Sequence, residues 1–188
     1  MSILHVANLG HPVLKGKAQS VSKAELKKPA FQAFLDDLMA SMDYHDGVGL
    51  AAPQVFHAVR VVAVVVPPDL DPEGKGIGPE VFINPEITPI GTAEEEDWEG
   101  CLSLKDLRGL VPRFRELTLE ALDRQGQPIS RKLVGYAARV LQHEVDHLDG
   151  VMFVDRMTSM DSLSFARELA WLNAQIEAEL ARDEEEEE

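Results

Sequence analysis

The run His143-Glu144-Val145-Asp146-His147 is the part of the sequence whose residue types and spacing indicate chemistry. Two histidines four positions apart lie on the same side of a helix, one turn apart, so both imidazoles can bind one metal ion. The Glu144 carboxylate would lie beside that ion, where it can accept a proton from water. Placing these ionisable side chains in one mainly apolar helix would be costly without a metal or strong pairing. The pattern therefore predicts a catalytic metal site.

A catalytic site of this kind needs a third protein ligand and leaves one position for water. Cys101, in the stretch EGCLS at residues 99–103, is the natural candidate, because a metal ion holds a thiol in its thiolate form. It is the single cysteine, which excludes an internal disulfide and favours a reducing compartment. The other imidazoles have no comparable context and are interpreted as surface or structural residues: His5, His11, His45 and His57.

A third segment, GVGLAAPQ at residues 47–54, combines small residues with one amide side chain. Glycines and alanines let a backbone pass close to a substrate or to a metal site. The amide of Gln54 can donate a hydrogen bond to a developing oxyanion. An ordinary tight loop is the alternative interpretation of this segment on its residues alone.

Helices are expected on both sides of these segments and around the paired histidines. Apolar residues recur at helical spacing over Lys23–Tyr44, with Ser22 as its N-cap and Pro29 as the residue near which the regular part begins. A second helix is predicted at Tyr136–Leu148 and ends at a glycine. A third is predicted at Ser162–Arg182.

Strands are predicted from valine-rich or alternating runs bounded by turn residues. They cover Arg60–Val66, Val81–Asn84, Glu86–Gly91, Thr92–Trp98, Leu110–Phe114, Leu117–Asp123 and Pro128–Val134, with a loop at Pro67–Pro79 and a hairpin turn at Arg124–Gln127. Strands grouped between helices predict an α+β fold, with antiparallel or mixed β-sheets packed around a central metal-binding helix, an N-terminal helix and a C-terminal helix. We expect one catalytic domain over residues 1–182 and an acidic tail over 183–188.

The charge of the chain argues against several classes of partner. The formal net charge is −15, of which residues 183–188 supply six, so the remainder carries −9. An acidic body repels phosphate backbones, which argues against sustained nucleic-acid binding. No apolar run reaches membrane-spanning length, and the N-terminus resembles neither a secretory signal nor a transit peptide. We therefore expect a cytoplasmic protein, or an organellar one if a presequence has been removed.

The chain resembles the peptide deformylase family. Three signature stretches of that family are present in order: GVGLAAPQ at residues 47–54, EGCLS at 99–103 and HEVDHLDG at 143–150. Family-like sequence also occurs at GHPVL (10–14), LRGLVPR (107–113) and LDRQGQP (122–128). The resemblance extends from about residue 3 to residue 157.

The resemblance implies a metal ligand set and a reaction. It assigns one ion, typically Fe²⁺ and replaceable by Zn²⁺, Ni²⁺ or Co²⁺, to Cys101, His143 and His147. A metal-bound water would attack the formyl carbon of a formyl-methionyl peptide at the start of a new polypeptide. Glu144 would act as general acid and base, and a support from Arg113 paired with Asp146 is expected behind the ligands.

The resemblance also implies residues for the oxyanion and for the peptide. Gln54 and the backbone N–H of Leu102 would hold the oxyanion. The peptide would add to a strand edge. The residues expected to bind it are Val48, Gly49, Trp98, Gly100, Arg108, Tyr136, Arg139 and Val140. Tyr136 and Arg139 are larger than the apolar residues common in many bacterial members and resemble an organelle-like or related bacterial subgroup.

Two other functions compete with this interpretation. A zincin-type metallopeptidase uses the same paired histidines, but it takes its third ligand from a downstream Glu or His rather than a cysteine. A metal-binding regulator without catalysis would not need Glu144, Gln54 and Cys101 together. Some deformylases contact the ribosome through a basic C-terminal helix, whereas residues 161–188 are acidic here. Transient proximity to the ribosome, rather than docking on its RNA, is the expectation.

Overall fold

The structure is a computed structural model that describes residues 2–71 and 75–174. Its first helical region consists of two helices, α1 (Lys23–Leu26) and α2 (Pro29–Tyr44). Ser22 caps α1 as predicted, accepting a hydrogen bond from the Glu25 N–H. The predicted single helix is interrupted at Lys28, which is extended because the ring of the following proline disfavours the helical conformation.

The strands form two sheets whose neighbours are all antiparallel. The larger sheet has the order β1-β2-β3-β6-β7, formed by β1 (Gly49–Ala51), β2 (Val61–Val66), β3 (Ile77–Pro89), β6 (Glu116–Leu122) and β7 (Pro128–Val134). The smaller sheet has the order β4-β5-β8, formed by β4 (Glu94–Cys101), β5 (Leu104–Phe114) and β8 (Ser164–Phe165). The β6–β7 hairpin matches its prediction closely.

Several strand boundaries differ from the sequence-based predictions. β3 is one strand where two were predicted, and it contains an irregularity beside Asn84, whose φ is 51°. It also begins at Ile77, inside the predicted loop. β5 begins at Leu104 rather than Leu110. Its first part was not predicted as a strand because it contains charged residues, which line a cleft in the structure. The short strands β1 and β8 were not predicted.

The start of the predicted C-terminal helix was wrong. Ser164 and Phe165 pair with β5 as β8, since contact with a neighbouring strand overrides the local helical spacing. A 3₁₀ turn follows at Ala166–Glu168, and residues 169–174 are helical. The rest of that predicted helix and the predicted acidic tail lie outside the described residues.

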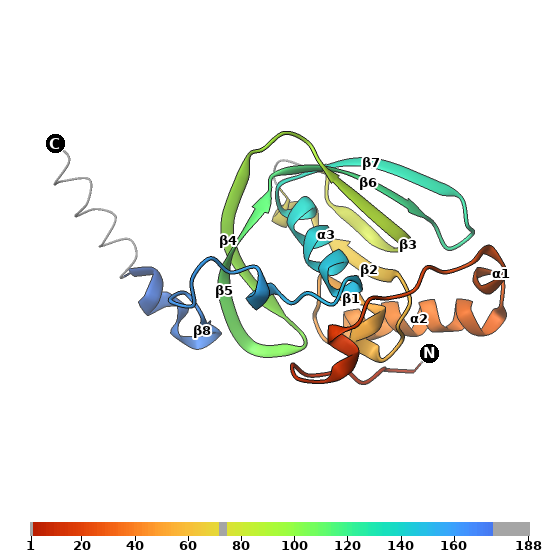
Figure 1. The fold of residues 1–188 in the computed structure, drawn as a ribbon, viewed down its shortest axis with the longest axis horizontal. Coiled ribbons are helices and arrows are strands. Elements are labelled where there is room, and N and C mark those ends of the chain that lie inside the picture. Colours follow the sequence, from red (N-terminus) through yellow and green to blue (C-terminus); the bar gives the residue numbers. More distant parts are fainter. Residues whose placement is uncertain (1, 72–74, 175–188) are drawn as a thin grey trace.

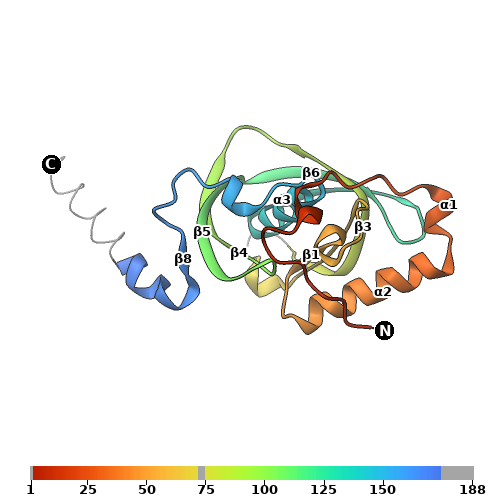
Figure 2. The same ribbon diagram turned by 60° about the horizontal axis from the view of Figure 1, so that its bottom comes forward.

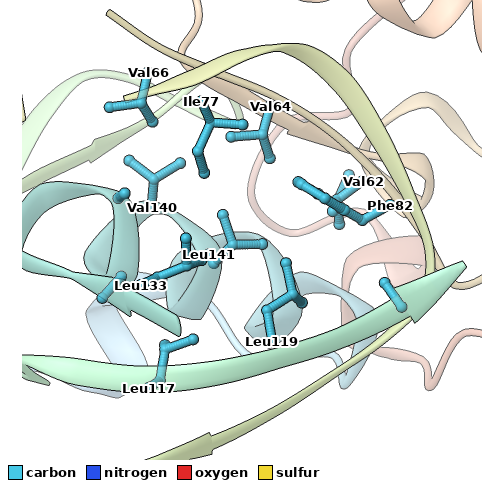
Figure 3. Close-up of a cluster of buried hydrophobic side chains, with 14 of the residues drawn as sticks. Val62, Val64, Val66, Ile77, Phe82, Leu117, Leu119, Leu133, Val140 and Leu141 are labelled. Carbon is cyan, nitrogen blue, oxygen red and sulfur yellow. The ribbon is translucent and has the colours of Figure 1, made fainter. Parts of the chain in front are cut away.

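The helix α3 (Gly135–Leu148) lies between the two sheets, as predicted (Figures 1 and 2). Its apolar side, including Leu141, packs on one face of the larger sheet together with Val62, Val64, Phe82 and Leu119 (Figure 3). Alternate residues of β2 therefore face α3, which explains why one side of this strand is apolar.

The opposite face of the larger sheet is covered by α2. Leu35 and Leu38 of α2 pack in one cluster with Val61, Ala63 and Ile83. β2 is thus buried on both faces, whereas β7 at the far edge of the sheet is largely exposed, and the sheet packs against one side of α3. None of the described helices is both long and apolar enough to cross a bilayer.

Candidate metal centre and active site

α3 carries six of the predicted site residues, namely Tyr136, Arg139, Val140, His143, Glu144 and His147. His143 and His147 lie one turn apart, and their Nε2 atoms are 3.2 Å from each other. Every residue from Ala137 to Leu148 is buried, so the helix is part of the core. At its N-terminus the Ala137 N–H donates to the carboxylate of Asp71, a buried residue from the β2–β3 connection. A carboxylate at this end of a helix stabilises it.

Cys101 ends β4 and meets the two imidazoles. Its Sγ lies 3.3 Å from His147 Nε2, and the three predicted ligand atoms all lie within 4.8 Å of one another. Around a tetrahedral ion with ordinary Zn–S and Zn–N bonds, ligand atoms stand about 3.3–3.6 Å apart. One sulfur and two imidazole nitrogens converging in this way fit a bound metal ion. The structure thus brings together the predicted ligand set.

Glu99 orients the ring of His143. Its Oε2 lies 2.8 Å from His143 Nδ1, and its two oxygens also accept hydrogen bonds from Arg113. Burial raises the pKa of Glu99, but the bonds from His143 and Arg113 outweigh it and lower the pKa to about 2. An ionised carboxylate only accepts hydrogen bonds, so Nδ1 donates and Nε2 is left free to bind a metal.

The predicted pair of Arg113 and Asp146 is confirmed. Arg113 Nη1 lies 2.5 Å from Asp146 Oδ2, and Arg156 binds the same carboxylate from the surface. Arg113 therefore links Glu99, beside the ligands, with Asp146 on α3. Sequence reasoning assigned no role to Glu99, although it lies two residues before Cys101 and thus on the same face of β4.

Glu144 lies beside the ligands with one oxygen unpaired. Its Oε2 has no hydrogen-bond partner among the described residues. Burial raises its pKa to about 6, although the neighbouring histidines lower it. Gly49 of β1 makes room for this side chain, because a Cβ on Gly49 would collide with the carboxylate. The segment 47–54 is therefore a close backbone approach to the site.

The amide of Gln54 is held in one orientation. Its Oε1 accepts a hydrogen bond of 2.8 Å from the Ala51 N–H, and its Nε2 points toward Cys101 Sγ at 3.4 Å and Ser103 Oγ at 3.2 Å. The amino group is thus directed at the metal site, where it can donate to an anionic oxygen.

A cleft of about 500 Å³ opens beside these groups. It is lined by Cys101, His143, Glu144, Gln54 and Leu102 and by the eight predicted peptide-binding residues, Val48, Gly49, Trp98, Gly100, Arg108, Tyr136, Arg139 and Val140. His147 is not among the residues that line it. The lining residues that sequence reasoning missed are His45, Asp46, Gly47, Glu99, Lys105 and Asp106, each of which lies in or next to a signature stretch.

Three peptide-binding candidates have further contacts. Arg108 lies so close over Gly100 that a Cβ there would meet its guanidinium. The indole Nε1 of Trp98 donates to Asn173 Oδ1 over 3.0 Å, which joins the cleft wall to the C-terminal segment. The guanidinium of Arg139 is buried against Glu99 and main-chain carbonyls.

Comparison with known proteins gives consistent matches. The family model of polypeptide deformylase matches residues 3–163. "Peptide deformylase 2" of Nostoc sp. is 40% identical over 158 residues, covering 84% of this chain and 87% of that protein. A Met-Ala-Ser-bound class I type b peptide deformylase from Acinetobacter baumannii has a TM-score of 0.75 and 38% identity, covering 83% of this chain and 99% of that one. Peptide deformylase from Thermotoga maritima has a TM-score of 0.75 and 33% identity, covering 85% and 100%. The chain belongs to the polypeptide deformylase family of enzymes.

Proposed function

We propose that this enzyme removes the formyl group from the N-terminal formyl-methionine of newly made polypeptides. The observation that carries the proposal is the convergence of the Cys101 sulfur, two imidazoles and the unpaired Glu144 oxygen at one cleft. A relative whose structure is described with Met-Ala-Ser bound supports a peptide beginning with methionine as the occupant of that cleft.

Cys101, His143 and His147 would hold one Fe²⁺ ion, replaceable by Zn²⁺, Ni²⁺ or Co²⁺. When bound, such an ion supplies Lewis acidity, which polarises a carbonyl and lowers the pKa of water. Glu99 supports this role by fixing the His143 ring with Nε2 toward the other ligands.

Glu144 moves the proton. Its Oε2, which has no partner among the described residues, accepts a proton from the attacking water and returns it to the departing methionine amine. The amide of Gln54 and the N–H of Leu102 donate to the oxyanion of the tetrahedral intermediate. The fixed orientation of the Gln54 amide supports this assignment, because no reorganisation is needed during the reaction.

The peptide binds along β4, whose described pairing is with β5 alone, so its other edge can accept an added strand. The methionine side chain occupies the part of the cleft near α3 and β1. The residues that surround the peptide are lining residues of the cleft that were predicted for it, namely Val48, Gly49, Trp98, Gly100, Arg108, Tyr136 and Val140.

The test compares formyl-Met-Ala-Ser with a peptide offering only internal bonds, using anaerobically prepared enzyme of known metal content. We expect rapid release of formate and no internal cleavage. Glu144→Gln should retain the metal and lose at least about 10²-fold in kcat. Preference for the internal bond would instead support the zincin-type metallopeptidase.

The same preparation tests the metal. An enzyme loaded with Fe²⁺ should be the most sensitive to air, since oxygen attacks the iron and its thiolate ligand, and Ni²⁺- or Co²⁺-loaded enzyme should retain activity. Activity of the freshly isolated enzyme that is indifferent to oxygen, together with zinc or nickel in metal analysis, would contradict iron as the native ion.

A further inference from the structure

Arg139 lies one helical turn before His143, and its side chain is bound inside the protein. The residue is 6% exposed. Its guanidinium donates to Glu99 Oε1 over 2.9 Å, to the Val111 carbonyl over 2.7 Å and to the Glu95 carbonyl over 2.5 Å. One side chain of α3 therefore binds the main chain of both β4 and β5.

These bonds join the two elements that carry the metal ligands. Cys101 is the last residue of β4, and His143 and His147 belong to α3. β4 and α3 are far apart in the sequence and belong to different layers of the fold (Figure 1). The guanidinium of Arg139 on α3 binds the main chain of β4 at Glu95, in the strand that ends at Cys101.

Arg139 and His143 also share one carboxylate. Arg139 binds Oε1 of Glu99, and His143 Nδ1 binds Oε2. Arg113 binds both oxygens from β5 and has no bond to the main chain of β4 among those of the described residues. Arg139 thus adds a direct bond from α3 to the main chain of β4, whereas Arg113 links the two elements through the side chains of Glu99 and Asp146.

We propose that Arg139 is a positioning residue for the metal ligands, which fixes β4 against α3 and holds Glu99 in place to orient His143. The inference rests on the proposed metal-dependent function, because it takes Cys101, His143 and His147 as ligands. It differs from the substrate contact that the family resemblance implies for Arg139. A guanidinium suits the task because its donors lie on separate nitrogens in one rigid plane and reach Glu99, β5 and β4 together, whereas the three donors of an ammonium group all radiate from a single nitrogen on a flexible stem.

The experiment is a titration of metal-free protein with Co²⁺, followed by the thiolate-to-cobalt and ligand-field absorption bands. Arg139→Met removes every donor, and we expect it to weaken Co²⁺ binding about 10- to 100-fold and to alter the ligand-field bands. Arg139→Lys should bind Co²⁺ more tightly than Arg139→Met but less tightly than the unaltered protein. Arg131→Met is the control: it removes an arginine of β7 that pairs with Glu80 outside the cleft, and should leave Co²⁺ affinity unchanged.

The outcome that overturns the proposal is an unaltered Co²⁺ affinity and spectrum in Arg139→Met with a raised KM for formyl-Met-Ala-Ser. Arg139 would then be a substrate contact. Near-UV circular dichroism verifies that each variant is folded. If Arg139→Met does not fold, Arg139→Lys decides, and Co²⁺ binding equal to that of the unaltered protein would refute the role. Unaltered protein that binds Co²⁺ but cannot release formate contradicts the proposed function, while the titration still decides the role of Arg139.

Discussion

Gly49 of β1 lies directly against the carboxylate of Glu144 on α3, and a methyl group on its Cα would occupy the space of Oε1. The glycine is therefore required by its neighbour rather than by its own backbone angles. Two residues that are far apart in the chain determine together where the proposed proton acceptor lies.

Gly49→Ala should displace Glu144 and lower kcat/KM about 100-fold, since a shift of about 1 Å in a catalytic group has effects of that size. Steady-state kinetics on formyl-Met-Ala-Ser measures the change. Gly78→Ala on β3 is the control, because a Cβ there meets nothing within 4 Å, and it should leave the kinetics unchanged. Equal activity in both variants would show that Glu144 has room to move.

Gln54→Ala should lower kcat about 10²- to 10³-fold with little change in KM, because in the proposed function the lost donor acts on charge that develops only in the transition state. Gln32→Ala removes an amide that binds the Leu26 and Arg124 carbonyls away from the cleft, and should leave kcat unaffected. A loss in Gln54→Ala that appears mainly in KM would reassign this side chain to peptide binding.

Glu144 should make metal-free protein less stable as the pH rises. Its pKa is about 6 in the fold against 4.5 ordinarily, so the folded state holds the proton more tightly. The resulting stability is complete below pH 4.5 and is lost as the pH rises through 6. Glu144→Gln stays uncharged, so its unfolding free energy relative to the unaltered protein should increase by about 2 kcal/mol from pH 4 to pH 8. Urea unfolding at both pH values measures this, and a difference that is constant with pH would contradict it.

Arg113 and Arg156 both bind the carboxylate of Asp146, Arg113 from the protein interior and Arg156 from the surface. Arg113→Met leaves Glu99 and Asp146 buried without their main partner and should lower the unfolding free energy by about 3–5 kcal/mol. The Arg156 side chain is 50% exposed, so Arg156→Met should lower it by less than about 1 kcal/mol. Denaturant titrations of the two variants measure their unfolding free energies. Similar decreases in both would mean that burial does not determine how much each arginine stabilises the protein.

The sequence predicted the parts of the site that depend on local spacing. His143 and His147 are neighbours on any helix, and Gly150, with a φ of 76°, marks where α3 ends. Glu99 was missed because it follows an acidic run, Glu94–Asp97, that is exposed in the structure. Its burial arises when β4 folds over α3, and the one local sign of it is the spacing of two residues from Cys101.

The fold was predictable to a similar extent. The β6–β7 hairpin is specified by its own turn, where Gly126 has a φ of 79°. β8 contains only two residues, which form a strand because they pair with Leu107 and Arg108. The spacing of apolar residues around them predicted a helix, because it carries no information about that distant pairing. The order of strands in the two sheets depends on such distant pairings and could not be obtained from periodicity.

The burial of α3 from Ala137 to Leu148 has a consequence for how the ligands can separate. A helix enclosed by sheets on both sides cannot unwind while the sheets stay in place, so its backbone amides should exchange with deuterium only when the whole domain opens. His143 and His147 then remain paired for as long as the protein is folded, and loss of the ion alone leaves the imidazoles ready to accept another.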